Sequence, residues 1–352
     1  MSIQPMTFSS LPARPLVSVV VANYNYERYV CRAIESLQGQ TWRRWEAVIC
    51  DDGSADRSAE IIASYAGRDP RVRLVRQANG GMASALNRAV ALTGGELIAL
   101  LDSDDEYLPE RLEAVIERFR SHPEAGVVCH PLRAVRVDGE VIKAFHPRLL
   151  AEGWLGPGML RGVEPALPPC SGLTFRREVA ERVFPLPERF RRCADKVAQD
   201  RAALLAPVTS LREPLALYRI HGANLTGLSG PVTLEAVRSN LEFLEALWAD
   251  RAEFIRRWHG FEADVTPWRE VESAHFFLAA RLLGSGGDSR IQPSSIPSAW
   301  KRNVWRLLLA MPRPAALAAL RLWWTENAVK RNLRLVWDFV AGPPAWTGRA
   351  QG

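Results

Sequence analysis

Two groups of closely spaced aspartates have the clearest potential for chemistry in this sequence. Asp102 and Asp104 stand two positions apart in the segment L-D-S-D-D, directly after the mainly apolar stretch 96–101. Side chains two apart on an extended chain share one face, about 6–7 Å from each other. Two carboxylates there repel each other unless a cation lies beside them, and oxygen ligands favour Mg²⁺ or Mn²⁺, completed by a diphosphate and water. The alternative is a turn and helix cap ahead of Pro109, because Asp and Ser also form turns readily.

Asp51 and Asp52 form the second pair and follow another apolar stretch, residues 45–50. A carboxylate at the end of a strand can accept a hydrogen bond from a ribose hydroxyl or from a base N–H group. An Asx turn followed by a helix cap at Ser54 or Asp56 explains the same residues equally well. The residues alone leave both interpretations open.

The acids follow stretches that alternate between strand and helix patterns. Short apolar runs predict buried strands, and apolar residues at helical spacing come after each run. The expected strands are residues 16–22, 45–50, 72–75 and 96–101, with helices around 29–37, 56–65, 83–92 and 109–119. This order predicts an α/β fold, in which a mostly parallel sheet carries helices on both faces.

Polar loops follow all four expected strands. Right-handed crossovers bring the carboxyl ends of parallel strands to one edge, where such sheets bind ligands, so these loops should meet. They read N-Y-N at 23–25, D-D-G-S at 51–54, N-G-G at 79–81 and D-S-D-D at 102–105. The first strand is not followed by G-x-G-x-x-G, and G-x-x-x-x-G-K-[ST] is absent from the sequence. A Rossmann dehydrogenase and a P-loop enzyme are therefore disfavoured.

Four segments in this order and spacing make the sequence similar to family 2 glycosyltransferases. They read V-S-V-V-V-A-N-Y-N, D-D-G-S-A-D, N-G-G-M-A-S-A-L-N-R-A and L-D-S-D-D, and the resemblance covers about residues 15–225. It implies a Rossmann-like GT-A fold, the A-type fold of nucleotide-diphospho-sugar transferases. It also implies an inverting enzyme with a UDP-linked nucleotide-sugar donor, a Mg²⁺ or Mn²⁺ cofactor, and a sugar or lipid-linked acceptor in cell-envelope or surface polysaccharide synthesis.

The resemblance gives a role to each residue that matches a family motif. Asp52, or its neighbour Asp51, would bind the base, and Asp102 would contact the ribose. Asp104 and His221 would hold the metal, with His221 in the segment Y-R-I-H-G-A-N, although a single histidine is more often packed or exposed than a ligand. The full set expected to bind the nucleotide sugar is Ala22, Asn23, Tyr24, Asp51, Asp52, Asn79, Asp102 and Ser103.

The catalytic base of the family lies in an E-D pair near a downstream helix. Here the matching residues are Ala194 and Asp195, so the usual glutamate is missing and Asp195 is the expected general base. It would take the proton from an acceptor hydroxyl. Asp195 could instead cap a helix or pair with Lys196 or Arg191. Asp200 is the nearest competing carboxylate, deeper in the helix expected at 195–205.

Composition and charge limit the class of protein. Of 352 residues, 47% are apolar and 24% are charged, which is typical of a globular protein and excludes disorder and collagen. Five widely spaced cysteines fit reduced thiols in the cytoplasm and exclude a disulfide scaffold. The net charge of +6 is uneven: residues 290–352 hold ten Lys or Arg and two acids, or +8, which leaves −2 for residues 1–289.

We expect three regions: a flexible N-terminus at 1–14, a catalytic domain at 15–228, and a helical C-terminal region at 229–352 with a basic, Trp-rich tail. Within the catalytic domain, 15–108 would bind the nucleotide and 109–228 the acceptor.

No signal peptide or uninterrupted apolar run of 18 residues is found, so we expect a cytoplasmic protein. Cationic segments with Trp and an apolar face suit a membrane interface. The tail would therefore lie on the cytoplasmic membrane face, or else pack on the catalytic body; nucleic acid is not an expected partner, because the site is acidic.

Two other functions compete with glycosyl transfer. A sugar-phosphate nucleotidyltransferase on the same fold would need a Gly-rich, cationic loop after the first strand, and residues 23–25 provide no cation. A non-catalytic adaptor at the membrane surface would need the tail alone. The complete set of site acids disfavours the adaptor.

Overall fold

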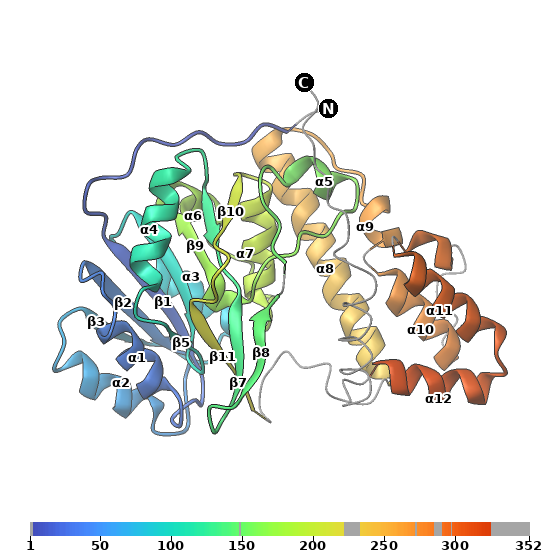
Figure 1. Cartoon of the computed structure of the whole chain (residues 1–352), viewed down its shortest axis with the longest axis horizontal. Coiled ribbons are helices and arrows are strands. Elements are labelled where there is room, and N and C mark those ends of the chain that lie inside the picture. Colours follow the sequence, from blue (N-terminus) through green and yellow to red (C-terminus); the bar gives the residue numbers. More distant parts are fainter. Residues whose placement is uncertain are drawn as a thin grey trace. The chain divides into compact units, whose positions relative to one another are not determined.

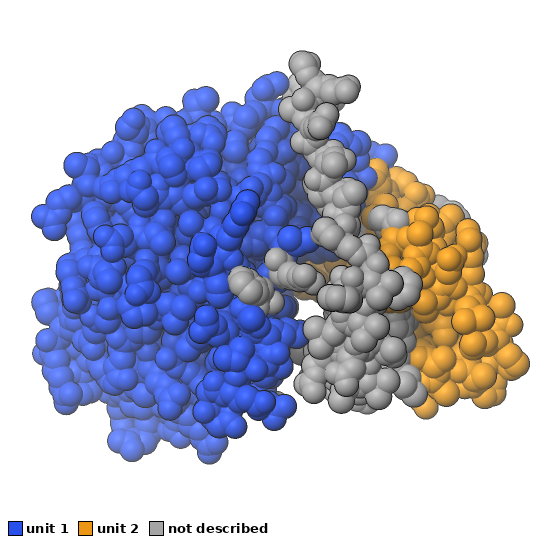
Figure 2. Space-filling view, in the orientation of Figure 1, with its two compact units in different colours: residues 1–225, 247–265 blue, residues 226–246, 266–352 orange. Residues whose placement is uncertain are grey.

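The computed structural model of the chain describes residues 3–147, 149–221, 233–271, 273–284, 291–296 and 298–324. The chain divides into two units (Figure 2). The first contains residues 1–225 and 247–265, and the second contains residues 226–246 and 266–352. Helix α8 (Leu234–His259) contributes its first half to the second unit and its second half to the first.

A seven-stranded sheet forms the centre of the first unit, with the strand order β10-β6-β9-β4-β1-β2-β3 (Figure 1). Its strands are β1 (Val17–Asn23), β2 (Trp45–Asp51), β3 (Val72–Arg76), β4 (Leu97–Asp102), β6 (Val127–Cys129), β9 (Leu173–Arg176) and β10 (Val208–Ser210). All neighbours pair in parallel except β9, which is antiparallel to β4 and to β6. The predicted α/β fold with a mostly parallel sheet is therefore confirmed.

Helices cover both faces of this sheet (Figure 1). Val17, Val19 and Val21 of β1 belong to one buried core with apolar residues of α1, α2 and α4. Helices α3 and α6 pack on other residues of the strands. Because both faces are buried, β1, β2 and β4 are mainly apolar, and for this reason the sequence reveals them. The helices are α1 (Val30–Gln38), α2 (Ser58–Ala66), α3 (Met82–Val90), α4 (Arg111–Ser121), α5 (Gly156–Leu160), α6 (Arg177–Val183) and α7 (Ala194–Ala203).

A smaller sheet has the order β5-β11-β7-β8 and contains β5 (Glu106–Tyr107), β7 (Leu132–Arg136), β8 (Val141–His146) and β11 (Ala216–Ile220). Strand β5 begins four residues after β4 ends, so the D-S-D-D loop turns the chain from one sheet into the other. Strand β11 is antiparallel to β5, with Leu217 opposite Glu106. This pairing brings the residues after β11 next to the turn after β4.

Residues 3–14 contain no strand or helix, but they contact other residues of the first unit. Ile3 is buried, and the N–H of Met6 donates a hydrogen bond to the carbonyl of Leu205 (2.8 Å). The Arg176 guanidinium donates to the carbonyl of Ser9 (2.9 Å).

The second unit is helical in its described part: besides the first half of α8 it contains α9 (Thr266–Val271), α10 (Ala274–Leu283), α11 (Ala299–Ala310) and α12 (Arg313–Trp324). Phe277, Trp305 and Leu320 lie in its core, and the indole N–H of Trp305 donates to Nδ1 of His275 (2.6 Å). The helices expected at 234–248 and 252–258 form the single helix α8, because neither Gly nor Pro separates them. None of the helices described is both long and apolar enough to span a membrane.

The predicted tail falls partly within the described residues. On α11, Trp305 and Leu308 are buried, whereas Trp300 is 41% exposed and Leu307 is 59% exposed. The remaining tail residues of the prediction, from 325 onward and including Trp337 and Trp346, lie outside the described part of the chain.

A buried ion pair joins α7 to the second half of α8 and gives the first prediction. Arg251 donates to Oδ2 of Asp200 at 2.8 Å, and both side chains are 1% exposed. Asp200→Ala leaves a buried guanidinium without this partner, so we expect the free energy of unfolding of the first unit to fall by about 3–5 kcal/mol in urea titrations. Arg57→Ala, which removes the exposed pair with Glu60, should cost less than about 1 kcal/mol. Equal losses in the two variants would contradict the structural role of Asp200.

Candidate active site

The carboxyl ends of three neighbouring strands bring the predicted residues together. In the register of the sheet, Ala22 lies opposite Cys50 on one side and opposite Asp102 on the other. Asn23 lies opposite Asp51 in the next pair. The Ser103 hydroxyl donates to the carbonyl of Ala22 (3.0 Å), which links the loop after β4 to β1. The loops after β1, β2 and β4 therefore meet at one edge of the sheet.

Asp51 is fully buried and organises the loop after β1. Its Oδ1 accepts hydrogen bonds from Nδ2 of Asn23 (3.0 Å) and from the Ser54 hydroxyl (2.5 Å). The Ser54 hydroxyl in turn accepts the N–H of Asn25, which has a positive φ of 59°. Tyr24 is 46% exposed, so its ring is accessible at this edge.

Asp52 holds the loop between β3 and α3. Its Oδ1 accepts hydrogen bonds from the side-chain amide of Gln77 and from the N–H of Gly80, both at 2.8 Å, and its Oδ2 accepts the N–H of Gly81 (2.7 Å). These partners lie 25–29 residues away in the sequence, so the contacts are long-range and do not form a local Asx turn. In the same loop, the side-chain and backbone oxygens of Asn79 accept hydrogen bonds from the Arg191 guanidinium.

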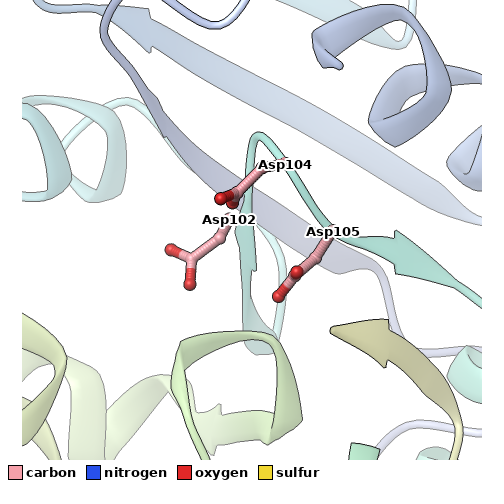
Figure 3. A group of neighbouring side chains, drawn as sticks. All are labelled: Asp102, Asp104 and Asp105. Atoms are coloured by element: carbon pink, nitrogen blue, oxygen red, sulfur yellow. The ribbon is translucent and has the colours of Figure 1, made fainter. Parts of the chain in front are cut away.

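Three carboxylates project from the turn after β4 (Figure 3). One oxygen from each of Asp102, Asp104 and Asp105 lies within 4.8 Å of the others. Burial raises the pKa of Asp102 and of Asp105 well above the usual range, and the neighbouring Asp104 carboxylate raises both further. A bound cation would relieve this repulsion, because it favours the charged form of each acid.

His221, the residue after β11, lies beside this turn. Its Nε2 is 3.0 Å from Oδ2 of Asp104, and its ring stacks on Tyr29 at 4.7 Å between ring centroids. A cavity of about 440 Å³ opens here, lined by residues 25–29, Asp56 and His221. The rest of the predicted segment, residues 222–224, lies outside the described part of the chain.

The donor set fits a divalent metal. Carboxylate oxygens suit Mg²⁺ and Mn²⁺, and an imidazole suits the transition metals. Asp104 and His221 already place an oxygen and a nitrogen next to each other. When bound, such an ion would neutralise charge on a diphosphate.

A short loop that sequence reasoning missed connects these acids to Asp195. Residues 170–172 form a 3₁₀ turn before β9. The Cys170 thiol is hydrogen-bonded to Asp102, and the backbone N–H of Cys170 donates to the carboxylate of Asp195. Ser171 accepts the N–H of Asp102 (3.0 Å) and donates to Oδ2 of Asp105 (2.6 Å). The prolines and glycine in P-P-C-S-G indicate a tight loop, but nothing in the sequence indicates which acids it contacts.

Asp195 lies in the first turn of α7. Burial raises the pKa of its carboxyl above the usual value, while the backbone N–H groups of Lys196 and Cys170 lower it in part. Cys193, the residue before the helix, has a φ of 52°, a left-handed conformation that is uncommon for a residue other than Gly. Asp200, the competing carboxylate, is paired with Arg251 (2.8 Å) and with Lys196 (3.1 Å).

Residues 18–184 match the model of Glycosyl transferase family 2. This part of the chain is therefore similar to glycosyltransferases of that family. An uncharacterized glycosyltransferase of Nostoc sp., alr2836, is 38% identical over 212 residues, 59% of this chain and 66% of that protein. Chondroitin synthase of Pasteurella multocida is 38% identical over 138 residues, 39% of this chain and 14% of the synthase. The chain thus spans between 14% and 66% of the length of these relatives.

A solved structure is similar to this chain in fold. Mannosyltransferase PcManGT from Pyrobaculum calidifontis, in complex with GDP-Man and Mn²⁺, aligns over 96% of this chain and 88% of that chain, with a TM-score of 0.50 and 18% identity. The similarity agrees with the GT-A fold that the sequence implies. At this identity it concerns the fold alone.

Proposed function

We propose that the chain transfers a sugar from a UDP-linked donor to an acceptor hydroxyl, with inversion at the anomeric carbon. One observation carries this proposal. Two consecutive residues of one loop, Cys170 and Ser171, bind the acid turn and the separate carboxylate of Asp195. An acid cluster for a metal diphosphate and a nearby base are the two parts that a single displacement requires.

The donor would bind along the loops after β1, β2 and β4. Asp51 or Asp52 would contact the base and Asp102 the ribose, with Ala22, Asn23, Tyr24, Asn79 and Ser103 completing the site. Asp104 and His221 would hold Mg²⁺ or Mn²⁺, and we assign no other ligand. Asp51 and Asp52 are also engaged within the protein, so a base would add to hydrogen bonds that already exist.

Asp195 would accept the proton of the acceptor hydroxyl. The N–H groups of Cys170 and Lys196 fix its carboxylate, and burial raises its pKa, which strengthens it as a base. No protein acid is needed on the opposite side, because a nucleoside diphosphate leaves as an anion. One displacement inverts the anomeric configuration.

The relatives suggest a setting for this reaction. The matched chondroitin synthase is named for polysaccharide synthesis, and we propose that this chain acts in the synthesis of a cell-envelope or surface polysaccharide. Residues 15–228 would act as the catalytic domain. A sugar-phosphate nucleotidyltransferase is disfavoured because residues 23–25 provide no cation for a triphosphate.

We also propose that the protein is cytoplasmic and attaches to the cytoplasmic membrane face. Helix α11 supports attachment, because Trp300 and Leu307 are exposed on it near Arg306. A cation near an anionic surface adds about 1 kcal/mol to binding. A lipid-linked acceptor would then be within reach.

Asp104→Ala should reduce metal-dependent turnover of a nucleotide sugar by about 10²-fold or more, because it removes a ligand of the ion that stabilises the leaving group. The measurement is the release of UDP with Mn²⁺ present. Asp138→Ala, which removes an exposed acid of the hairpin between β7 and β8, is the matched control and should leave the rate unchanged. A near-normal rate in Asp104→Ala would show the metal assignment to be wrong.

Asp195→Asn should reduce transfer by about 10²–10⁴-fold while donor affinity stays the same, since the amide keeps the shape but cannot accept a proton. In the wild type, Asp195 must be ionised to act. Because its pKa is raised, activity should decrease with falling pH at a higher pH than an exposed aspartate would produce. A loss of donor affinity equal to the loss of rate would mean that Asp195 is structural.

The full chain should sediment with anionic liposomes at low salt. Replacing both Trp300 and Leu307 by Gln should weaken binding by about tenfold or more, because each buried apolar side chain contributes about 1.5–3 kcal/mol. Val141→Gln, at a 50% exposed position in the first unit, is the control. If the wild type stays in the supernatant, α11 is not a membrane-binding surface.

A further inference from the structure

The third acid of the D-S-D-D turn, Asp105, is engaged on both of its oxygens. It is 1% exposed. Its Oδ2 accepts the hydroxyl of Ser171 (2.6 Å), and its Oδ1 accepts the backbone N–H of Arg219 (3.0 Å). These partners come from two segments that are 66 and 114 residues away in the sequence. Asp105 therefore connects the turn to the loop before β9 and to β11.

The contact with Arg219 contributes to the position of His221. Strand β11 pairs with β5 only as far as Leu217, and beyond that point the Asp105 carboxylate binds the next N–H, that of Arg219. The Arg219 side chain donates through Nε to the carbonyl of Asp104 (3.2 Å). Two residues later, His221 lies 3.0 Å from Asp104. Together with the pairing of β11 with β7, which extends to Ile220, the hydrogen bonds of Asp105 and Arg219 thus hold these two groups at this separation.

Ser171 fixes the other side of the turn. Its hydroxyl accepts the backbone N–H of Asp102 and donates to the carboxylate of Asp105. Ser171 therefore links the residues on either side of Asp104 in the turn. The side chain is fully buried. Water is therefore a poor replacement for it, and a buried donor or acceptor without a partner is strongly unfavourable.

We propose that Asp105, Ser171 and Arg219 are positioning residues, which hold Asp104 and His221 together as the metal-binding pair, and that Asp105 is not itself a metal ligand. This inference rests on the proposed function. It gives the three neighbouring carboxylates different roles: Asp104 would bind the metal, Asp102 would contact the nucleotide-sugar donor, and Asp105 would hold the turn in place. A simple count of acids would treat all three as ligands.

The test is the affinity of the full chain for Mn²⁺ in the presence of UDP, measured from the free Mn²⁺ signal in electron paramagnetic resonance. Ser171→Ala and Asp105→Ala should each weaken binding by about tenfold. Asp105→Asn should stay within about threefold of the wild type, because its amide can still accept from Arg219 and donate to Ser171. Asp104→Asn, which alters a ligand, should lose binding.

Thr174→Val is the matched control. Thr174 is also fully buried and its hydroxyl accepts a hydrogen bond from Arg111 (2.9 Å), but it touches no acid of the site. It should lower the melting temperature about as much as Ser171→Ala does and leave Mn²⁺ affinity unchanged. If Ser171→Ala binds Mn²⁺ like the wild type, or Asp105→Asn loses it as Asp104→Asn does, the inference is overturned while the proposed function stands. If the wild type binds no Mn²⁺, the metal assignment of the proposed function fails, and this inference with it.

Discussion

Repulsion among buried carboxylates is the constraint on which this site depends. One oxygen from each of Asp102, Asp104 and Asp105 lies within 4.8 Å of the others. Besides burial, the carboxylates of Asp104 and Asp195 both raise the pKa of Asp102. Burial and mutual repulsion raise pKa values here, so the folded chain must supply donors or a cation. It supplies the Ser171 hydroxyl, the Cys170 thiol, the backbone N–H groups of Cys170 and Arg219, and the imidazole of His221. Tyr26 nearby experiences the same field: burial raises the pKa of its phenol, and Asp104 and Asp102 raise it further.

The two sheets of the first unit bring the partners of these carboxylates to the turn after β4. The large sheet brings the ends of β1, β2 and β4 to one edge, where the nucleotide sugar is proposed to bind. The small sheet returns β11 past the turn, which delivers His221. The loop before β9 reaches the turn from a third direction, and through the N–H of Cys170 it also fixes Asp195. The proposed donor site and the proposed base would therefore be held by the same few residues, and a change in one is expected to affect the other.

Much of the first half of the fold could be predicted from the sequence, because its signals are local. The strands that end at Asn23, Asp51 and Asp102 are mainly apolar, and a polar loop follows each of them. The contacts of Ser171 with Asp105 and of Arg219 with Asp105 join residues far apart in the chain, and no local pattern encodes them. The structure also shows that Asp52 accepts hydrogen bonds from Gly80 and Gly81, a long-range contact that the sequence does not indicate. The local turn and cap that the sequence left open are seen instead at Asp51, which accepts the N–H of Ser54 (3.3 Å), and at Asp56, which accepts the N–H of Ser58 (3.0 Å).

Calorimetric titration of the full chain with UDP, with Mn²⁺ and then with EDTA, tests the central claim most directly. If the acids form a site for a metal diphosphate, UDP should bind in the presence of Mn²⁺, and EDTA should weaken binding by about tenfold or more. A parallel titration with GDP shows whether the base is selected. Binding of UDP that is equally tight in EDTA, or no binding of either nucleotide, would contradict the account.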